Sequence, residues 1–176
     1  MNTTYIVHRK RQGSLDVFGP TIEFLTLPEE MDGSYCVMMG TIPAGVSVPL
    51  HSHPDLESFF LISGTVDALS HDGEKFEWLA VKPGEFVHVP SNAKHAWRNI
   101  SSEPALQLIT TTPKLGRFFQ EIGRPVTPGV PLPPPTPGAL QLFLRVAAEY
   151  GYWLGSPAEN AAIGITLFED TRALLS

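Results

Sequence analysis

Apolar residues between about Tyr5 and Thr111 occur in short runs that are separated by Gly, Pro, Asn and Asp. Successive runs end at turn-forming sequences such as Pro43-Ala44-Gly45, Ser63-Gly64 and Lys82-Pro83-Gly84. The runs are Tyr35–Ile42, Glu57–Ile62, Val66–Leu69, Phe76–Val81, Phe86–Val89 and Ala105–Thr110. Many short strands at near-regular spacing predict an all-β sandwich or jelly roll.

The periodicity changes after Thr111. Thr112-Pro113 resembles a helix start, and an apolar face recurs at helical spacing until Gly123, which predicts a helix over Pro113–Ile122. A proline-rich segment, Arg124 to Gly138, follows as an extended strap. We expect two further helices, one from Pro137 to near Gly151 and a short one that begins with a capping box at Ser156. We therefore divide the chain into a β-barrel (1–112) and a helical extension packed on it (113–176).

Composition excludes several classes of protein. The chain has 176 residues, 43% of them hydrophobic and 17% charged, which is typical of one globular domain. Its net charge of −6 argues against nucleic-acid binding. The single cysteine, Cys36, forms no intrachain disulfide. Neither a signal peptide nor an apolar run long enough to cross a membrane is present, so we expect no membrane partner and a cytoplasmic location.

Four side chains in two separated stretches point to metal chemistry. His51, His53 and Glu57 have the same parity, so on an extended strand they would leave from one face. His95 follows the turn-like sequence Pro90-Ser91-Asn92 and could complete the set. Imidazoles with a carboxylate bind divalent first-row metals well, and four protein ligands leave one or two positions open for water, substrate or dioxygen.

The two stretches form a recognisable pair of motifs. The first has Gly45, His51, His53, Glu57 and Gly64 at the spacing G-x5-HxH-x3-E-x6-G. The second has Gly84, Pro90, Asn92, His95 and Asn99 at the spacing G-x5-PxN-x2-H-x3-N. This pair resembles the cupin superfamily, with Asn92 in place of a glycine that is expected to adopt a left-handed conformation.

The resemblance implies a double-stranded β-helix, that is, a cupin jelly-roll barrel, with a few C-terminal helices added. It also implies one divalent transition metal (Fe, Mn, Ni, Co, Cu or Zn) bound by His51, His53, Glu57 and His95. Affinity alone does not choose among these metals.

Parity also indicates which apolar side chains surround the ligands. Trp97 shares the parity of His95, while Phe59 and Leu61 continue that of Glu57. Met39 is a weaker candidate because the register of its strand is uncertain. These side chains would form barrel core, a substrate pocket, or both.

The C-terminal sequence narrows the resemblance. The segment T-P-K-L-G-R-F-F-Q-E-I-G, followed by P-V-T-P-G and A-A-E-Y-G, is similar to small monocupins of the quercetin 2,3-dioxygenase-like branch. This implies a metal-dependent dioxygenase acting on a flavonol or similar small aromatic substrate, with dioxygen as co-substrate and Glu57 as catalytic base. The resemblance also favours a homodimer.

Two alternatives stay open because a fold does not fix a function. One is a non-catalytic, metabolite-sensing cupin. The other is a metal-dependent isomerase or lyase of a small acid or sugar, which should have Arg or Lys in its pocket. Lys94 and Arg98 are out of phase with His95, which disfavours that second alternative.

Overall fold

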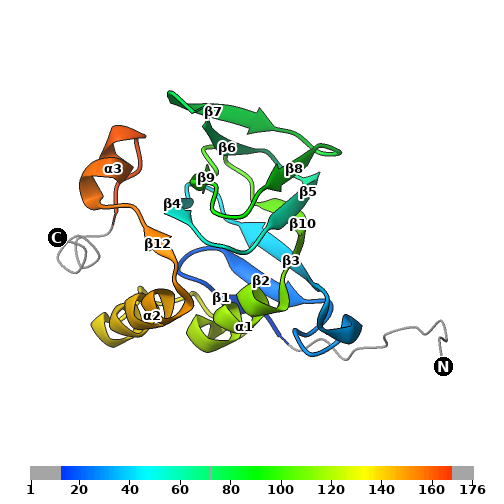
Figure 1. The fold of residues 1–176 in the computed structure, drawn as a ribbon. Helices are drawn as coiled ribbons and strands as arrows, with labels where there is room; N and C mark the ends of the chain where they lie inside the picture. The colour runs from blue at the N-terminus through cyan, green and yellow to red at the C-terminus, as the bar shows by residue number, and fades with distance from the viewer. Residues whose placement is uncertain (1–12, 72, 168–176) are drawn as a thin grey trace.

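The protein is built from two antiparallel β-sheets that face each other, with three α-helices outside them (Figure 1). The computed structural model describes residues 13–71 and 73–167. This confirms the expected all-β jelly roll with helices added after it.

The large sheet has seven strands in the order β11-β1-β2-β3-β10-β5-β8. Its strands are β1 (Leu15–Asp16), β2 (Thr21–Phe24), β3 (Cys36–Ile42), β5 (Glu57–Ser63), β8 (Phe86–Val89), β10 (Ala105–Thr111) and β11 (Arg124–Pro125). The small sheet has the order β12-β4-β9-β6-β7. Its strands are β4 (Ser47–Ser52), β6 (Val66–His71), β7 (Phe76–Val81), β9 (His95–Arg98) and β12 (Trp153–Leu154). A short 3₁₀ helix, Met31–Gly33, lies between β2 and β3.

Strict alternation of burial explains why the central strands of the large sheet pair as they do. In β3 and β10 every second side chain is buried, beginning with Cys36 and Ala105 respectively. The buried side chains enter one core between the two sheets, which contains Met38, Phe59 and Trp97 among others. Because a slip of one residue would turn all of these side chains to solvent, the core fixes the register of the strands.

The helices begin and end where local capping signals place them. α1 (Pro113–Ile122) has Thr112 as its N-cap, and the Thr112 hydroxyl accepts a hydrogen bond from the Leu115 amide (3.2 Å). α2 (Pro137–Tyr150) ends at Gly151, which is left-handed with φ 75°. α3 (Pro157–Ala162) has the capping box of Ser156 and Glu159. All three predicted helices are confirmed. No helix in the described part of the chain has the length and hydropathy needed to cross a bilayer.

The C-terminal extension contributes one short strand to each sheet. β11 pairs with β1 at the edge of the large sheet, and β12 pairs with β4 at the edge of the small sheet. The helices α1 and α2 contact each other and lie below the strands in the view of Figure 1. The extension therefore closes one end of the sandwich, next to the strand that carries His51.

Candidate metal centre and cavity

The structure brings together the four side chains that the sequence singled out. His51 lies on β4, His53 directly follows that strand, Glu57 opens β5 and His95 opens β9. Their ligand atoms lie within 4.8 Å of one another. The expectation that His51, His53 and Glu57 share one strand needs correction, because the chain crosses from the small sheet to the large sheet between His53 and Glu57. The cluster therefore spans the two sheets.

Each imidazole is oriented by a backbone carbonyl two residues away in the chain. Nδ1 contacts the carbonyl oxygen of Pro49 in His51 (2.7 Å), of Asp55 in His53 (2.8 Å) and of Ala93 in His95 (2.9 Å). Since a carbonyl can only accept a hydrogen bond, Nδ1 carries the proton and the Nε2 lone pair is free in each neutral ring. A neutral imidazole in this tautomer is the form that binds a metal through Nε2.

Two of these lone pairs are buried without a hydrogen-bond partner in the described structure, Nε2 of His53 and Nε2 of His95. Each lies 3.3 Å from Oε2 of Glu57. With all four ligand atoms within 4.8 Å of one another, a single point lies within about 3 Å of every one, and shifts below about 1 Å reach metal–ligand distances of about 2.0–2.2 Å. The donor set therefore fits one divalent transition metal.

Burial and mutual proximity perturb the acid–base behaviour of the cluster. Burial, together with the charges of His95 and His53, holds the pKa of His51 well below its ordinary value of 6.5. Burial also acts to lower the pKa of His53, but the neighbouring Glu57 carboxylate outweighs it and raises that pKa. Burial acts to raise the pKa of Glu57, yet His53 and His95 outweigh burial and hold it well below 4.5. Glu57 is therefore ionised and His51 neutral near pH 7.

A buried network ties the C-terminal extension to the first motif through Asp55. The Asp55 carboxylate accepts hydrogen bonds from the Tyr152 hydroxyl (2.7 Å) and from the Thr112 hydroxyl. The Asp55 carbonyl in turn holds Nδ1 of His53, and the Tyr152 ring lies 5.3 Å from the His53 ring, centroid to centroid. Asn92 has the expected left-handed conformation (φ 64°), and its backbone N–H donates a hydrogen bond to the His53 carbonyl at 2.7 Å. His53 is thus fixed by both motifs and by the extension.

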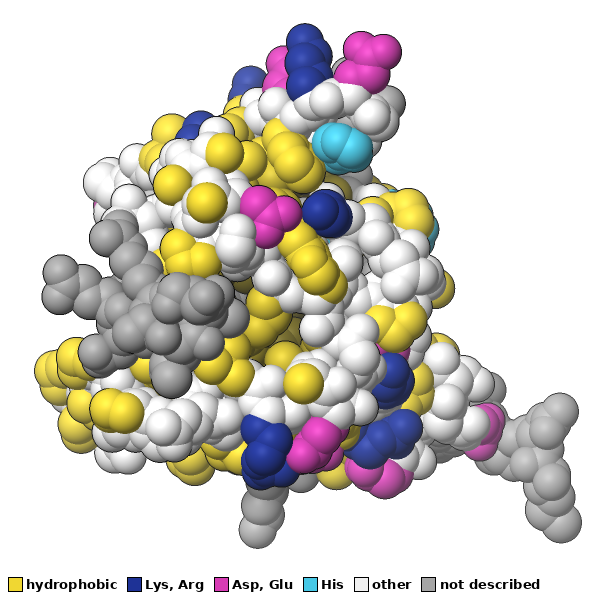
Figure 2. Space-filling model, turned by 60° about the vertical axis from the view of Figure 1, so that its left-hand side comes forward, with side chains coloured by type: hydrophobic (Ala, Val, Ile, Leu, Met, Phe, Trp, Pro, Cys, Tyr) yellow, Lys and Arg dark blue, Asp and Glu magenta, His cyan; other side chains and the backbone are white. Residues whose placement is uncertain are grey.

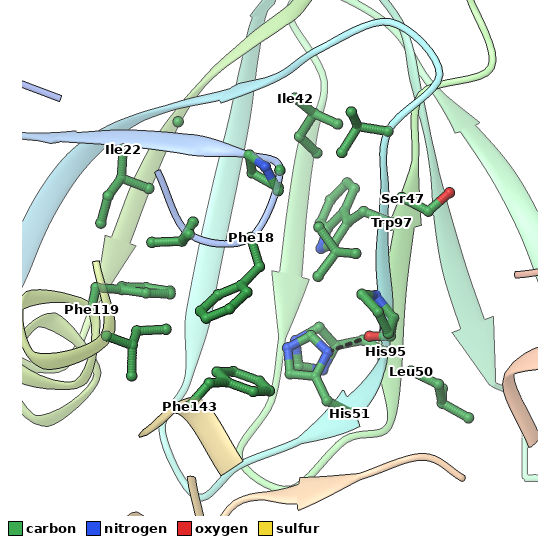
Figure 3. Close-up of a pocket in the computed structure, with 18 of the residues that line it drawn as sticks. Phe18, Ile22, Ile42, Ser47, Leu50, His51, His95, Trp97, Phe119 and Phe143 are labelled. Atoms are coloured by element: carbon green, nitrogen blue, oxygen red, sulfur yellow. Dashed lines mark hydrogen bonds between the residues drawn. The ribbon is translucent and has the colours of Figure 1, made fainter. Parts of the chain in front are cut away.

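The four ligands lie in the wall of an apolar cavity of about 410 Å³. In Figure 3, His51 and His95 lie at one end of the cavity and Ile22 and Ile42 at the other. Phe18, Phe119 and Phe143 lie along one side, and Trp97 lies opposite them. The side view of Figure 2 shows a hollow with hydrophobic side chains inside it, on the face formed by the C-terminal extension. Such a volume suits a small organic ligand.

Two of the four pocket residues proposed from sequence line this cavity. Trp97 and Phe59 do so, with their ring centroids 4.6 Å apart. Leu61 points inward from β5 but belongs to the core beyond the cavity wall. Met39 requires a correction: the alternation of β3 turns Met38 and Gly40 inward, so Met39 lies on the outer face of the large sheet.

Sequence reasoning did not identify several residues of the wall. Phe18 precedes β2, Phe119 lies on α1 and Phe143 lies on α2. Parity arguments reach only residues on the strand that carries a ligand, so they cannot find a wall supplied by other elements. The apolar faces of the two predicted helices, which contain Phe119 and Phe143, were the sequence feature that could have identified these two residues.

The other histidines and the basic residues that the structure describes do not line the cavity. His88 Nδ1 lies 3.0 Å from the Ser58 hydroxyl, across two neighbouring strands. Arg98 pairs with Asp67 at 2.8 Å, and Lys94 lies over the Trp153 ring, 3.9 Å from its centroid. His71 is exposed, and His8 lies outside the described residues.

The family model described as "Cupin domain" matches residues 38–111. Quercetin 2,3-dioxygenase from Bacillus subtilis (strain 168) is 27% identical to this chain over 95 residues, which are 53% of this chain. The chain covers only 27% of that relative's length.

Among solved structures, the similar folds include a cupin 2 conserved barrel domain protein from Salinispora arenicola CNS-205. It has 16% identity, covers 63% of this chain and 90% of its own, and has a TM-score of 0.51. Oxalate decarboxylase from Bacillus subtilis has 21% identity, covers 58% of this chain and 27% of its own, and has a TM-score of 0.48. The first of these likenesses supports the fold alone.

Proposed function

The chain belongs to the cupin superfamily, and on that premise we propose that it is a metal-dependent dioxygenase acting on a flavonol or similar small aromatic substrate. The metal would be held by His51, His53, Glu57 and His95. The proposal goes beyond the family, whose members perform many reactions on one fold.

The observation that carries the proposal is the chemistry of the cavity wall beside the ligands. Among the described residues that line it, none is Lys or Arg, and the one carboxylate is Glu57. Seven Phe, Trp or Tyr side chains, including Phe18, Phe143 and Trp97, line it together with many aliphatic ones. Burying a charged substrate in such surroundings without a counter-charge would be costly, so the wall favours a neutral, ring-shaped molecule.

A bound divalent transition metal would supply a Lewis acid with open coordination positions for substrate and dioxygen. The chain's own contribution begins with Glu57, whose carboxylate is ionised and lies beside the ligand nitrogens. It would accept the proton of a substrate hydroxyl placed at the centre. The apolar side chains of the wall would contact the faces of the substrate rings and would exclude water from the deprotonated oxygen. In a dioxygenation both oxygen atoms enter the substrate, so no external reductant is needed.

The wall also bears on the alternatives. An isomerase or lyase of a small acid or sugar would use cationic side chains to bind its substrate, and Lys94 and Arg98 pair elsewhere. A non-catalytic, metabolite-binding protein would use the same enclosed apolar cavity. Only turnover distinguishes such a protein from an oxygenase.

The test combines metal analysis with oxygen uptake. Protein purified without added ions should contain close to one transition metal per chain, and the loaded protein should consume oxygen with a flavonol. Glu57→Gln, in a protein shown to keep its metal, should lose about 10²- to 10⁴-fold in rate if Glu57 is the base. Full metal loading without oxygen uptake on any flavonol or catechol would contradict the oxygenase and favour the binding protein.

We also propose a cytoplasmic homodimer. The thiol of the buried Cys36 donates to the carbonyl of Thr26 (3.2 Å), which is compatible with a reducing compartment. The outer face of the large sheet has adjacent exposed apolar side chains, Phe60 and Phe86, which are cross-strand partners. A second copy of the chain could bury this patch, because the same patch on two chains can pair with itself about a two-fold axis.

A further inference from the structure

One polar side chain of the cavity wall has no role in the centre described above. Gln107 lies on β10, is 4% exposed, and points inward into the cavity. Its amide forms no hydrogen bond with any residue that the structure describes. The fully buried side-chain atoms without a partner in the described structure belong to His53 and His95, so the Gln107 amide is open to the cavity and free to bond a ligand there.

Its distance from the metal ligands follows from strand pairing. Glu57 pairs with Thr111, Phe59 with Ile109 and Leu61 with Gln107, so three inward-facing rows follow one another along β5 and β10. Four residues separate Thr111 from Gln107, which is about 13 Å along the strand. Phe59 and Ile109 form the apolar row between the two polar ends.

The chain makes room for this arrangement at Gly40. A Cβ at that position would lie 2.6 Å from Cδ1 of Ile109 and 3.4 Å from Cγ of Gln107. Gly40 itself lines the cavity, and because it has no Cβ it leaves space for the Gln107 side chain beside it. The amide therefore faces cavity rather than packed core.

We propose that Gln107 is a substrate-binding residue that hydrogen-bonds a polar group at the end of the substrate remote from the metal. The inference rests on the proposed function and adds the shape of the ligand. The substrate is a neutral, planar ring system with a chelating oxygen at one end and a hydroxyl or carbonyl group on its distal ring. A neutral amide suits such a group because it can both donate and accept without a charge.

The experiment compares two flavonols that differ at the distal rings. Quercetin has hydroxyl groups on both outer ring systems, whereas 3-hydroxyflavone has the chelating oxygens and no other hydroxyl group. Binding of each to the full-length, metal-loaded protein is measured by calorimetry without oxygen, so that affinity is read apart from turnover. Gln107→Leu keeps the side chain's approximate size, and Gln141→Leu, at an exposed site on α2, is the matched control.

Gln107→Leu should weaken quercetin binding about tenfold and leave 3-hydroxyflavone binding unchanged, since one neutral hydrogen bond is lost. Its melting temperature should not fall, because no described residue loses a partner. Gln141→Leu should bind both flavonols like the parent protein.

An equal loss for both flavonols would make Gln107 a determinant of cavity shape alone and overturn the inference. Unchanged quercetin binding would overturn it as well, as would failure of the parent protein to bind either flavonol. Selective loss of quercetin binding in a protein that consumes no oxygen would support the inference and refute the dioxygenase.

Discussion

At the scale of single residues, the geometry of the candidate metal centre is produced by the local backbone. Each ligand histidine has Nδ1 fixed by a carbonyl two residues away, so the rings are oriented before a metal arrives. Such a contact fixes the tautomer and the ring orientation that an imidazole needs to bind a metal through Nε2. The residue types and spacing could be predicted from sequence. The tautomers could not, because they depend on the exact path of Pro49, Asp55 and Ala93.

Errors at this scale have one physical source, the assumed register. Treating His51 to Glu57 as one strand selected side chains that do lie together, but for an incomplete reason, because both sheets contribute to the cluster. The same kind of argument placed Met39 inward, whereas β3 turns it outward. A period of two specifies which residues share a face, but not which face is buried.

The perturbed pKa values predict how metal affinity depends on pH. The pKa of His53 is raised from 6.5 and that of His51 is lowered, so His53 takes up a proton before His51 as the pH falls. Since a protonated imidazole cannot bind a metal, affinity should be full at high pH. It should then fall about tenfold per pH unit below the pKa of His53. Competitive metal titrations at pH 7.5, 6.5 and 5.5 would measure this, and an affinity that stays constant would contradict it.

At the scale of elements, the helices were predictable and the added strands were not. Thr112-Pro113, Thr136-Pro137 and Ser156-Pro157 are N-cap and N1 pairs whose effect is local, so the sequence predicts where each helix begins. β11 and β12 have two residues each and show no periodicity. Their strand conformation arises from pairing with β1 and β4, which are distant in sequence.

The link between the extension and the centre predicts an effect of Tyr152→Phe. Burial, and then the hydrogen bond to Asp55, raises the pKa of Tyr152, so its hydroxyl stays a donor at any ordinary pH. Removing it leaves the buried Asp55 carboxylate with one donor fewer. The free energy of unfolding of the metal-free protein should fall by about 1–3 kcal/mol. Metal affinity should fall by about tenfold, because the Asp55 carbonyl orients His53.

Tyr150→Phe is the matched control for this prediction. Its hydroxyl donates to Glu121 at an exposed position, so the same atom is removed without affecting Asp55. Unfolding of both variants by denaturant, and metal titration of both, would compare them. Equal effects of the two substitutions on metal affinity would refute the coupling.

At the scale of the whole molecule, the cavity exists only because distant segments enclose it. The four candidate metal-binding residues come from β4, β5, β9 and the turn after β4, whereas the opposite wall comes from the loop before β2, from α1 and from α2. The barrel and extension predicted from sequence are therefore joined in one site. Sequence periodicity could assign each element to a class, but the enclosure depends on tertiary contacts that no single element encodes.

The last prediction concerns the outer face of the large sheet as the interface of the proposed dimer. Phe86 is 65% exposed on edge strand β8, and Phe60 lies beside it on β5, so together they expose apolar surface on the side away from the cavity. Because burial of apolar area drives most association, Phe86→Glu should shift the proposed dimer towards monomer by at least about tenfold in dissociation constant. Ile100→Glu is the control, since Ile100 is 73% exposed and lies in the connection between β9 and β10, on no strand of the large sheet. Light scattering after size exclusion, over a range of concentrations, would measure both variants. A parent protein that is monomeric throughout, or an equal response to the two substitutions, would refute the interface.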